Sequence, residues 1–367
     1  MKIQELIHTL AQVAPASYQE SYDNAGLITG NPSWECTGCL VTLDCLEATV
    51  EEAVTKGCNL IVAHHPILFK AVKQLTGKDY IQKTLIKAIK EDIAIYAIHT
   101  NLDNVISGVN KKIADLLSLE NQRILLPKSG LLSTLITFVP SSAAGKVKQA
   151  LFDAGGGKLG NYSQCAFSTS GTGSFKPETG ARPAIGQVGQ KEEVQEERIE
   201  LIFPNHLQPQ LVQALLSSHP YEQVAYYIHP LNNLLGEVGS GIIGTLAEPI
   251  DFQGLFEKIK KIFHVKVIRH TALPSTQKKV RTVALCGGAG SFLTKEAIKQ
   301  GADVYITADV KYHEFFDADN QIVLADIGHF ESEQYTIELL FDILAQKFPT
   351  FAILKSVYYT NPVLYYI

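Results

Sequence analysis

Short apolar runs rich in Ile and Val recur along this chain, and segments with helical periodicity of roughly 10 to 15 residues separate them. Residues 1–126 predict helices near 2–13, 46–56, 79–91 and 107–118, and strands near 38–44, up to His64 and up to Ile98. Strands that alternate with helices in this way form βαβ units. The first third of the chain therefore predicts an α/β fold with a mostly parallel sheet and flanking helices.

The middle of the chain has a different pattern. Residues 127–232 predict strands at 131–139 and 199–203, helices at 144–153 and 207–217, and a glycine-dense connection at 155–162. The alternation resumes in residues 233–367, with a helix at 251–262, strands at 265–268, 280–285, 303–307 and 321–327, and helices at 291–300 and up to about 346. We therefore expect one α/β domain that is discontinuous in sequence, built from 1–126 and 233–367, with a small α+β domain of 127–232 inserted in it.

Three of the apolar runs lead directly to side chains that commonly bind metals. One run ends at His64 and His65, a second leads through His99 to Asp103, and a third leads to His329 and Glu333. Ligands of open α/β sheets gather beyond the carboxyl ends of the strands. The pattern predicts a metal site with His64, His65, Asp103, His329 and Glu333 as ligands, all at one edge of the sheet.

Each part of this pattern also has an ordinary explanation. A histidine pair at a strand end is commonly polar surface, and Asp103 could cap the following helix. A spacing of four residues, as between His329 and Glu333, also occurs on surface helices. The combination favours metal binding, because five donors exceed one closed tetrahedral site and suit two metals bridged by carboxylates.

The donor set suits divalent ions, with zinc first and manganese, iron or cobalt also compatible. We expect two such ions per subunit. His99 would lie outside the ligand set and orient a ligand by a hydrogen bond. Asp309 and His313 are candidates for outer-shell groups or for proton transfer, and they are the candidate catalytic residues. Glu331 is a further candidate for proton transfer.

Length and composition limit the other possibilities. A chain of 367 residues with 46% hydrophobic and 19% charged residues is typical of a folded protein with two or three domains. The net charge of −5 makes nucleic acid an unexpected partner. No apolar run is long enough to span a membrane, and the N-terminal residues predict an amphipathic helix, so we expect a cytoplasmic protein.

Two cysteines form a C-x-x-C pair, Cys36 and Cys39. A zinc ribbon needs a second such pair, which the sequence lacks, and a redox pair opens a helix, whereas a strand is predicted after Cys39. We assign no function to this pair.

Several motifs together resemble the Nif-three-like family of dinuclear-metal proteins, whose longer bacterial members are called GTP cyclohydrolase 1 type 2 homologues. They lie at residues 21–27, 63–66, 99–103 and 328–333, and further matches lie at 160–165, 171–177 and 219–226. Carried over position by position, the family's ligands fall on the five residues named above. The resemblance also implies a homohexameric ring and an insert similar to the ferredoxin-like PII and CutA proteins.

Two functions remain open at this point. The first is a metal-dependent hydrolase of the GTP cyclohydrolase kind, with a metal-activated water as nucleophile and a small nucleotide or phosphoester as substrate. In it, the glycine-rich turn 287–290 could bind phosphate through its N–H groups, although such a turn also serves tight helix packing. The second is a non-enzymatic metal-handling, regulatory or scaffolding ring. The sequence names neither the substrate nor the metals.

Overall fold

The computed structural model describes residues 1–274 and 278–366. The chain forms two compact units, one made of Met1–Pro127 with Glu237–Ile367 and the other of Lys128–Gly236. The first unit contains two sheets and the second contains one. Each unit is described by itself.

The first sheet of the larger unit has five strands in the order β1-β4-β3-β2-β15. Its strands are β1 (Gly26–Thr29), β2 (Cys39–Thr42), β3 (Leu60–Ala63), β4 (Ala94–Ala97) and β15 (Ile353–Lys355). Strands β15, β2, β3 and β4 are parallel, and β1 is antiparallel to β4. All residues of β2, β3 and β4 are buried, as expected for parallel strands covered on both faces.

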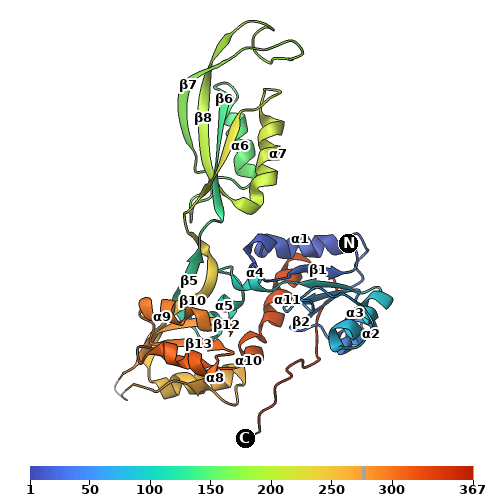
Figure 1. The fold of residues 1–367 in the computed structure, drawn as a ribbon, viewed down its shortest axis with the longest axis vertical. Coiled ribbons are helices and arrows are strands. Elements are labelled where there is room, and N and C mark those ends of the chain that lie inside the picture. Colours follow the sequence, from blue (N-terminus) through green and yellow to red (C-terminus); the bar gives the residue numbers. More distant parts are fainter. Residues whose placement is uncertain (275–277, 367) are drawn as a thin grey trace. The chain divides into compact units, whose positions relative to one another are not determined.

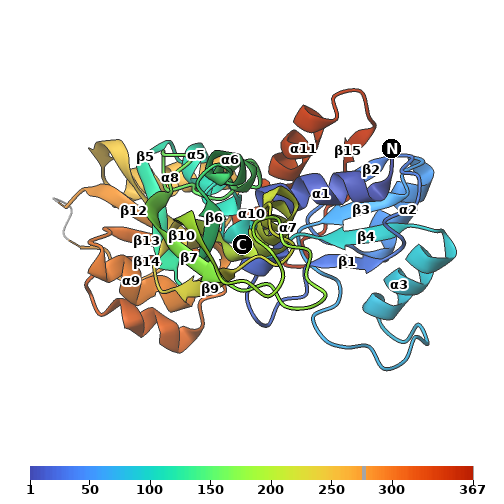
Figure 2. The ribbon, with the colours of Figure 1, turned by 90° about the horizontal axis from the view of Figure 1, so that it is seen from above.

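Helices cover both faces of this sheet. They are α1 (Ile3–Val13), α2 (Glu47–Thr55), α3 (Tyr80–Lys90), α4 (Thr100–Asp103), α5 (Val109–Leu116) and α11 (Thr336–Lys347), with a 3-10 turn η1 at Ala16–Tyr18. Helices α2 and α3 pack against Leu40, Ile61 and Ile95 of the strands. Figure 2 shows the C-terminal elements α11 and β15 beside α1 and β2 from the N-terminal part of the chain.

The second sheet has six strands in the order β11-β14-β13-β12-β10-β5. They are β5 (Leu119–Lys128), β10 (Leu235–Ile250), β11 (Arg269–His270), β12 (Val280–Ala289), β13 (Val304–Ala308) and β14 (Val323–Asp326). Strands β12, β13 and β14 are parallel, whereas β10 and β11 are antiparallel to their neighbours β12 and β14. Its helices are α8 (Phe252–Phe263), α9 (Thr294–Lys299) and α10 (His329–Glu333), with 3-10 turns η3 (Ser291–Leu293) and η4 (Tyr312–Ala318).

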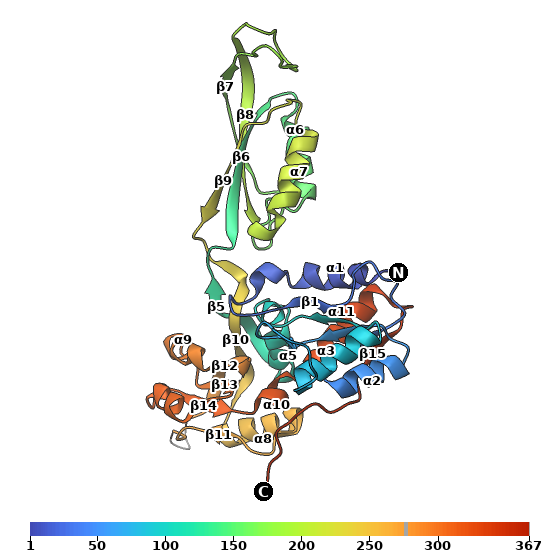
Figure 3. The same ribbon diagram turned by 45° about the vertical axis from the view of Figure 1, so that its right-hand side comes forward.

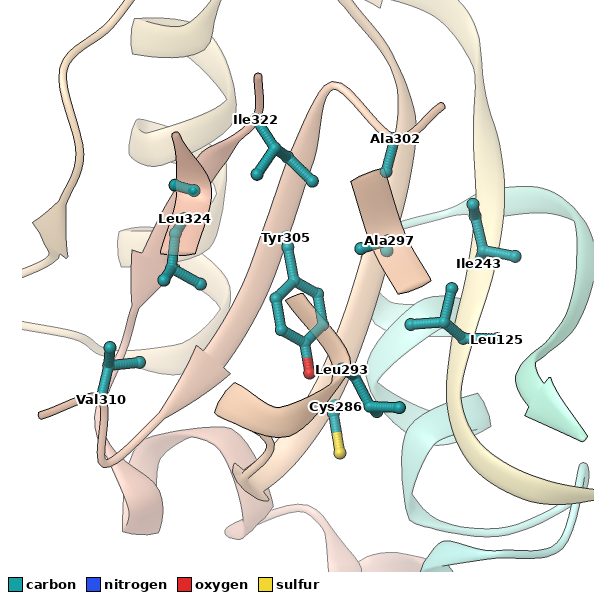
Figure 4. Close-up of a cluster of buried hydrophobic side chains, with 12 residues drawn as sticks. Leu125, Ile243, Cys286, Leu293, Ala297, Ala302, Tyr305, Val310, Ile322 and Leu324 are labelled. Atoms are coloured by element: carbon teal, nitrogen blue, oxygen red, sulfur yellow. The ribbon is translucent and has the colours of Figure 1, made fainter. Parts of the chain in front are cut away.

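A buried cluster holds α9 and η4 against this sheet (Figure 4). Tyr305 of β13 lies at its centre and is fully buried. Its hydroxyl donates to the carbonyl of Gly290 at 2.6 Å, which satisfies the one polar atom of the ring. In helix α8, the apolar residues Phe252, Leu255 and Ile259 recur at helical spacing and are buried, as expected for the core-facing side of an amphipathic helix.

The smaller unit consists of a four-stranded antiparallel sheet and two helices. Its elements follow the order β6 (Leu132–Pro140), α6 (Ala144–Asp153), β7 (Phe167–Phe175), β8 (Glu192–Pro204), η2 (Asn205–Leu207), α7 (Gln208–Ser218) and β9 (Tyr226–Leu231). The strand order is β7-β8-β6-β9, and Figure 3 shows α6 and α7 on one face of the sheet. A β-α-β-β-α-β order is that of ferredoxin-like α+β domains.

The mixed α/β architecture agrees with the expected class, but one expectation needs correction. Residues 1–126 and 233–367 do not share a single mostly parallel sheet. They form two sheets (Figure 1), and both sheets combine parallel and antiparallel pairs. Each sheet contains one strand from the other part of the chain, β15 in the first and β5 in the second (Figure 2). Apolar periodicity identifies strands without telling which strands pair, so the sequence could not separate the sheets.

Several local expectations also change. Residues 21–30, for which no strand was predicted, contain β1, and the strand expected at 265–268 is the short β11 at Arg269–His270. Strands β5, β7, β9, β10 and β15 were also not predicted. In the described ranges 1–274 and 278–366, no helix has the length and apolar character needed to cross a membrane.

Candidate metal centre

The five-stranded sheet places three groups of polar side chains at the carboxyl ends of its parallel strands. His64 and His65 directly follow β3, and Asp103 ends the short helix α4 that follows β4. Asp44 occupies the equivalent position after β2. Adjacent parallel strands end at the same edge, so these residues become neighbours although the chain separates them.

The six-stranded sheet contributes its own strand ends to the same place. His329 and Glu333 lie on the single-turn helix α10 after β14, and Asp309 follows β13. The expectation that all ligand candidates occupy one edge of one sheet is therefore wrong. The site lies between two sheets, and His65 and Glu333 meet across it.

Glu333 is the centre of the cluster. Its Oε2 lies 2.9 Å from His65 Nε2, 3.0 Å from His329 Nε2 and 3.9 Å from His64 Nε2. The Nε2 atoms of His65 and His329 are 3.3 Å apart. One buried carboxylate thus faces three imidazole nitrogens, and these three come from both sheets.

His64 and Asp103 form the second part of the cluster. His64 Nε2 lies 3.6 Å from Asp103 Oδ1. Among the described residues, these two atoms are buried without a hydrogen-bond partner. A buried polar atom without a partner is costly, so these two atoms fit the role of donors to a cation.

The three histidines share one hydrogen-bonding pattern. Nδ1 of His64 donates to the carbonyl of Ile98 at 2.9 Å, Nδ1 of His65 to Asp44 Oδ1 at 2.7 Å, and Nδ1 of His329 to Asp309 Oδ2 at 2.7 Å. Each acceptor fixes the ring so that Nε2 points toward Glu333. Histidine ligands of metal sites commonly have such an acceptor behind them.

Electrostatics of the site favour a bound cation. Burial, together with the charge of Glu333, raises the pKa of Asp103 well above its ordinary value of 3.8. Burial also opposes the charge of Glu333, but the adjacent His329 and His65 outweigh this and hold its pKa well below the usual range. Two carboxylates so close together cannot both be charged at low cost without a positive charge between them.

The pKa values of the three histidines also shift in opposite directions. Burial lowers the pKa of His64 to about 3, so its Nε2 carries a free lone pair at neutral pH. Burial also disfavours charge on His65 and His329. The contacts with Glu333, and with Asp44 or Asp309, outweigh that effect and raise the pKa values to about 9 and about 11. These two rings hold protons that a metal ion would displace.

Three groups of side chains could each hold a metal ion, with ligand atoms within 4.8 Å of one another. They are His64 with Asp103 and Glu333, His65 with His329 and Glu333, and His64 with His65 and His99. The first two share Glu333 and together use the five residues that the sequence pattern selects. This donor set of imidazoles and carboxylates fits zinc and related divalent ions. The structure brings the five residues together, and their role as ligands stays a prediction.

Three other candidate residues, His99, Asp309 and Glu331, lie near the site. His99 lies beside the cluster, with its ring centroid 5.3 Å from that of His64, and its Nδ1 bonds to Asp23 Oδ1 at 2.8 Å. Asp309 supports His329 as described. Glu331 is buried and lines the same cavity.

Two further alternatives concern His313 near the site and Asp103 as a helix cap. His313 lies in η4, where its ring contacts Tyr312 and Phe316, and it does not line the cavity. Asp103 does not cap the next helix, because Gly108 is the N-cap residue of α5.

The glycine-rich turn 287–290 does not offer free N–H groups to a phosphate. The N–H groups of Gly287, Gly288 and Gly290 donate to the side chains of Asn110, Ser332 and Thr307 at 2.9 to 3.0 Å. The turn instead allows close packing, because a Cβ on Gly288 would overlap the carboxylate of Glu333. The packing alternative therefore fits this turn, and the phosphate alternative does not.

Two supporting residues were missed at the sequence level. Asp44 directly follows an apolar strand, so the rule that selected His64 would also have selected it. Asp23 bonds to His99 Nδ1 and to Thr100, and these contacts outweigh the effect of burial and lower the pKa of Asp23 to about 2. Asp23 lies in the motif at residues 21–27, which entered the sequence analysis only as part of the family resemblance.

The cluster opens into a cavity of about 720 Å³. This volume lies within the range of small-molecule sites. Four exposed aromatic side chains contribute to its lining, namely Tyr22, Phe69, Tyr80 and Phe292. Carboxylates are frequent in the lining, whereas Arg269 is its one Lys or Arg side chain among the described residues.

Comparison with known proteins gives consistent matches over the whole chain. The family Duf34/NIF3 (NGG1p interacting factor 3) matches residues 1–362. A curated relative from Bacillus subtilis (strain 168), called "GTP cyclohydrolase 1 type 2 homolog", is 38% identical over 316 residues, which cover 86% of this chain and 84% of the relative. A protein of the same name from Halalkalibacterium halodurans is 38% identical over 328 residues, which cover 89% and 88%.

Solved structures match as well. The crystal structure of a Bacillus cereus protein related to NIF3 has a TM-score of 0.86 and 36% sequence identity, covering 100% of this chain and 99% of that one. A Staphylococcus aureus protein has a TM-score of 0.77 at 28% identity, with the same coverage.

Proposed function

Because the chain belongs to the Duf34/NIF3 family, we propose that it is a dinuclear-metal hydrolase of the GTP cyclohydrolase 1 type 2 homologue kind. The observation that carries the proposal is the shared geometry of the three histidines. Each has an acceptor on Nδ1 and directs Nε2 to one buried carboxylate, Glu333. That arrangement suits ligands held in place before a metal arrives.

Each metal has a proposed set of ligands. His64, Asp103 and Glu333 would hold one ion, and His65, His329 and Glu333 would hold the other, so Glu333 would belong to both ligand sets. When bound, two such ions supply a water activated near neutral pH as the nucleophile and polarise the group under attack. Zinc is the first candidate for both ions.

The protein itself would hold protons and the substrate. Asp309 fixes the ring of His329, and Glu331 offers a buried carboxylate in the cavity wall for proton transfer. The exposed aromatic rings at the cavity suit a planar base, and a cavity of about 720 Å³ admits a small nucleotide or phosphoester. The names of the curated relatives make GTP the first substrate to test.

The test compares metal content and turnover in matched variants. His64→Ala and Glu333→Gln should lose bound metal and turnover while remaining folded. Glu338→Gln, at a half-buried position of α11 that does not line the cavity, should retain both. Full activity of a metal-free preparation would contradict the proposal. Two bound metals without turnover of nucleotides, phosphoesters or amides would support the alternative of a non-enzymatic metal-handling or regulatory ring.

Three further features complete the proposal. By family resemblance, the protein forms a homohexameric ring, which its mass in solution would test. The unit Lys128–Gly236 is a PII/CutA-like module, supported by its strand and helix order. The protein acts in the cytoplasm, which localisation of a tagged chain would test.

A further inference from the structure

The segment after β15 reaches the candidate metal centre. Strand β15 is parallel to β2, with Lys355 opposite Val41, and the N–H of Ser356 donates to the carbonyl of Val41 at 2.8 Å. Parallel neighbours leave a sheet at the same edge. Residues 356–366 are therefore delivered to the edge where Asp44 follows β2.

This segment combines exposed apolar residues with buried polar ones. It contains no helix or strand, and Val357 and Leu364 are 83% and 87% exposed. Thr360 and Asn361 are only 8% and 9% exposed. Burial of the polar residues in an otherwise exposed segment indicates that their contacts hold it in place.

Thr360 contacts the carboxylate that supports His65. Its hydroxyl donates to Asp44 Oδ2 at 2.5 Å, while Asp44 Oδ1 accepts the hydrogen bond from His65 Nδ1 at 2.7 Å. Both carboxylate oxygens of Asp44 thus accept a hydrogen bond, one from Thr360 and one from His65. Rotation of the carboxylate away from His65 would break the Thr360 hydrogen bond.

A second contact holds the same segment on the opposite sheet. Asn361 Nδ2 donates to Glu331 Oε1 at 3.3 Å, and Asn361 Oδ1 accepts from the N–H of Val363 at 2.9 Å. The ring of Tyr359 also lies against Phe330, with centroids 4.8 Å apart. These contacts fix the residues on both sides of Thr360, Tyr359 and Asn361, so the Thr360 hydroxyl has a defined position.

We propose that Thr360 is a positioning residue of the metal centre, acting through Asp44 to set the orientation of His65. The inference rests on the proposed function, in which His65 is a metal ligand. The segment 356–366 then belongs to the site, because Thr360 is linked to His65 through the carboxylate of Asp44.

The test uses three variants of the full chain. Thr360→Val removes the donor with little change in shape, Thr360→Ser keeps a hydroxyl, and Leu364→Ala is a control in the same segment. Zinc affinity is measured by competition with a chromophoric chelator, the visible absorption of the cobalt-loaded protein reports ligand geometry, and thermal unfolding of the metal-free protein reports stability.

Thr360→Val should weaken binding of one metal by roughly 10- to 100-fold and change the cobalt spectrum, as losses of such supporting contacts do. Thr360→Ser should restore both readouts, and Leu364→Ala should match the unaltered protein. Unchanged affinity and spectrum in Thr360→Val, whatever its unfolding temperature, would overturn the inference and leave the proposed function intact. Absence of metal binding by the unaltered protein would instead overturn both.

Discussion

Gly288 lies so close to the carboxylate of Glu333 that no side chain fits at position 288. A Cβ on Gly288 would overlap Glu333 Oε1, and Gly288 has a φ of 61°, in the left-handed region. The N–H of Gly288 also donates to Ser332 Oγ at 3.0 Å, one residue before Glu333. The glycine-rich turn thus creates the space that the central carboxylate uses.

Replacement of Gly288 by alanine should therefore abolish metal binding. Gly301→Ala is a matched control, because Gly301 has a φ of 74° and nothing near its would-be Cβ. Both variants should lose about 1 to 2 kcal/mol of stability from backbone strain. Only Gly288→Ala should also displace Glu333 and lose metal, as measured by metal analysis after dialysis. Equal metal content in both variants would show that the proximity to Glu333 is unimportant.

Asp103→Asn should have opposite effects on the metal-free and metal-loaded protein. The pKa of Asp103 is raised in the folded state, so the metal-free protein loses stability as the pH rises above the ordinary value of 3.8. Asparagine lacks this loss and should raise the unfolding temperature of the metal-free protein at neutral pH. A zinc concentration of 100 times the Kd should raise the free energy of unfolding of the unaltered protein by about 2.7 kcal/mol, and that of the variant by less.

Thermal unfolding with and without chelator measures this reversal. A variant that is less stable than the unaltered protein in both conditions would contradict it.

Metal affinity should increase with pH. His65 and His329 have pKa values raised to about 9 and about 11, so both hold protons at neutral pH in the metal-free protein. Binding must displace these protons, whereas His64, with a pKa of about 3, has none to lose. Calorimetric titration in buffers of different ionisation enthalpy should show release of more than one proton. Affinity that does not change between pH 6 and 8 would argue against His65 and His329 as ligands.

Asp309→Asn should weaken metal binding, because Asp309 holds Nδ1 of His329. We expect a loss of roughly 10- to 100-fold in affinity for one metal. Asparagine tolerates the left-handed backbone at this position, where φ is 54°, so the fold should persist. Asp317→Asn, at an exposed position in η4, is the control. If Asp309 acted only in proton transfer, turnover would fall while metal affinity stayed unchanged.

Much of the site could be predicted because strand ends are local features. The apolar runs before His64 and before His329 fix where each strand stops, and both residues follow within three positions of a strand. The position of Asp44 obeys the same rule and was recoverable from the sequence. The two-sheet arrangement was not, since pairing of β10 with β12 or of β15 with β2 depends on contacts between distant segments.

Long-range side-chain contacts set a second limit. The Thr360–Asp44 hydrogen bond joins residues 316 positions apart, and no local pattern indicates it. Likewise, the choice for the motif 287–290 between close packing, which the sequence favoured, and phosphate binding stayed open until the partners of its N–H groups were known.

The division of the ligand candidates between two sheets has a consequence for when the site can form. His64, His65 and Asp103 come from early in the chain, and His329 and Glu333 from near its end. During synthesis on the ribosome, the early group would be complete long before its partners emerge. A nascent chain can present only half of the proposed two-metal centre, so we expect the two ligand sets that include Glu333 to be complete only in the finished polypeptide.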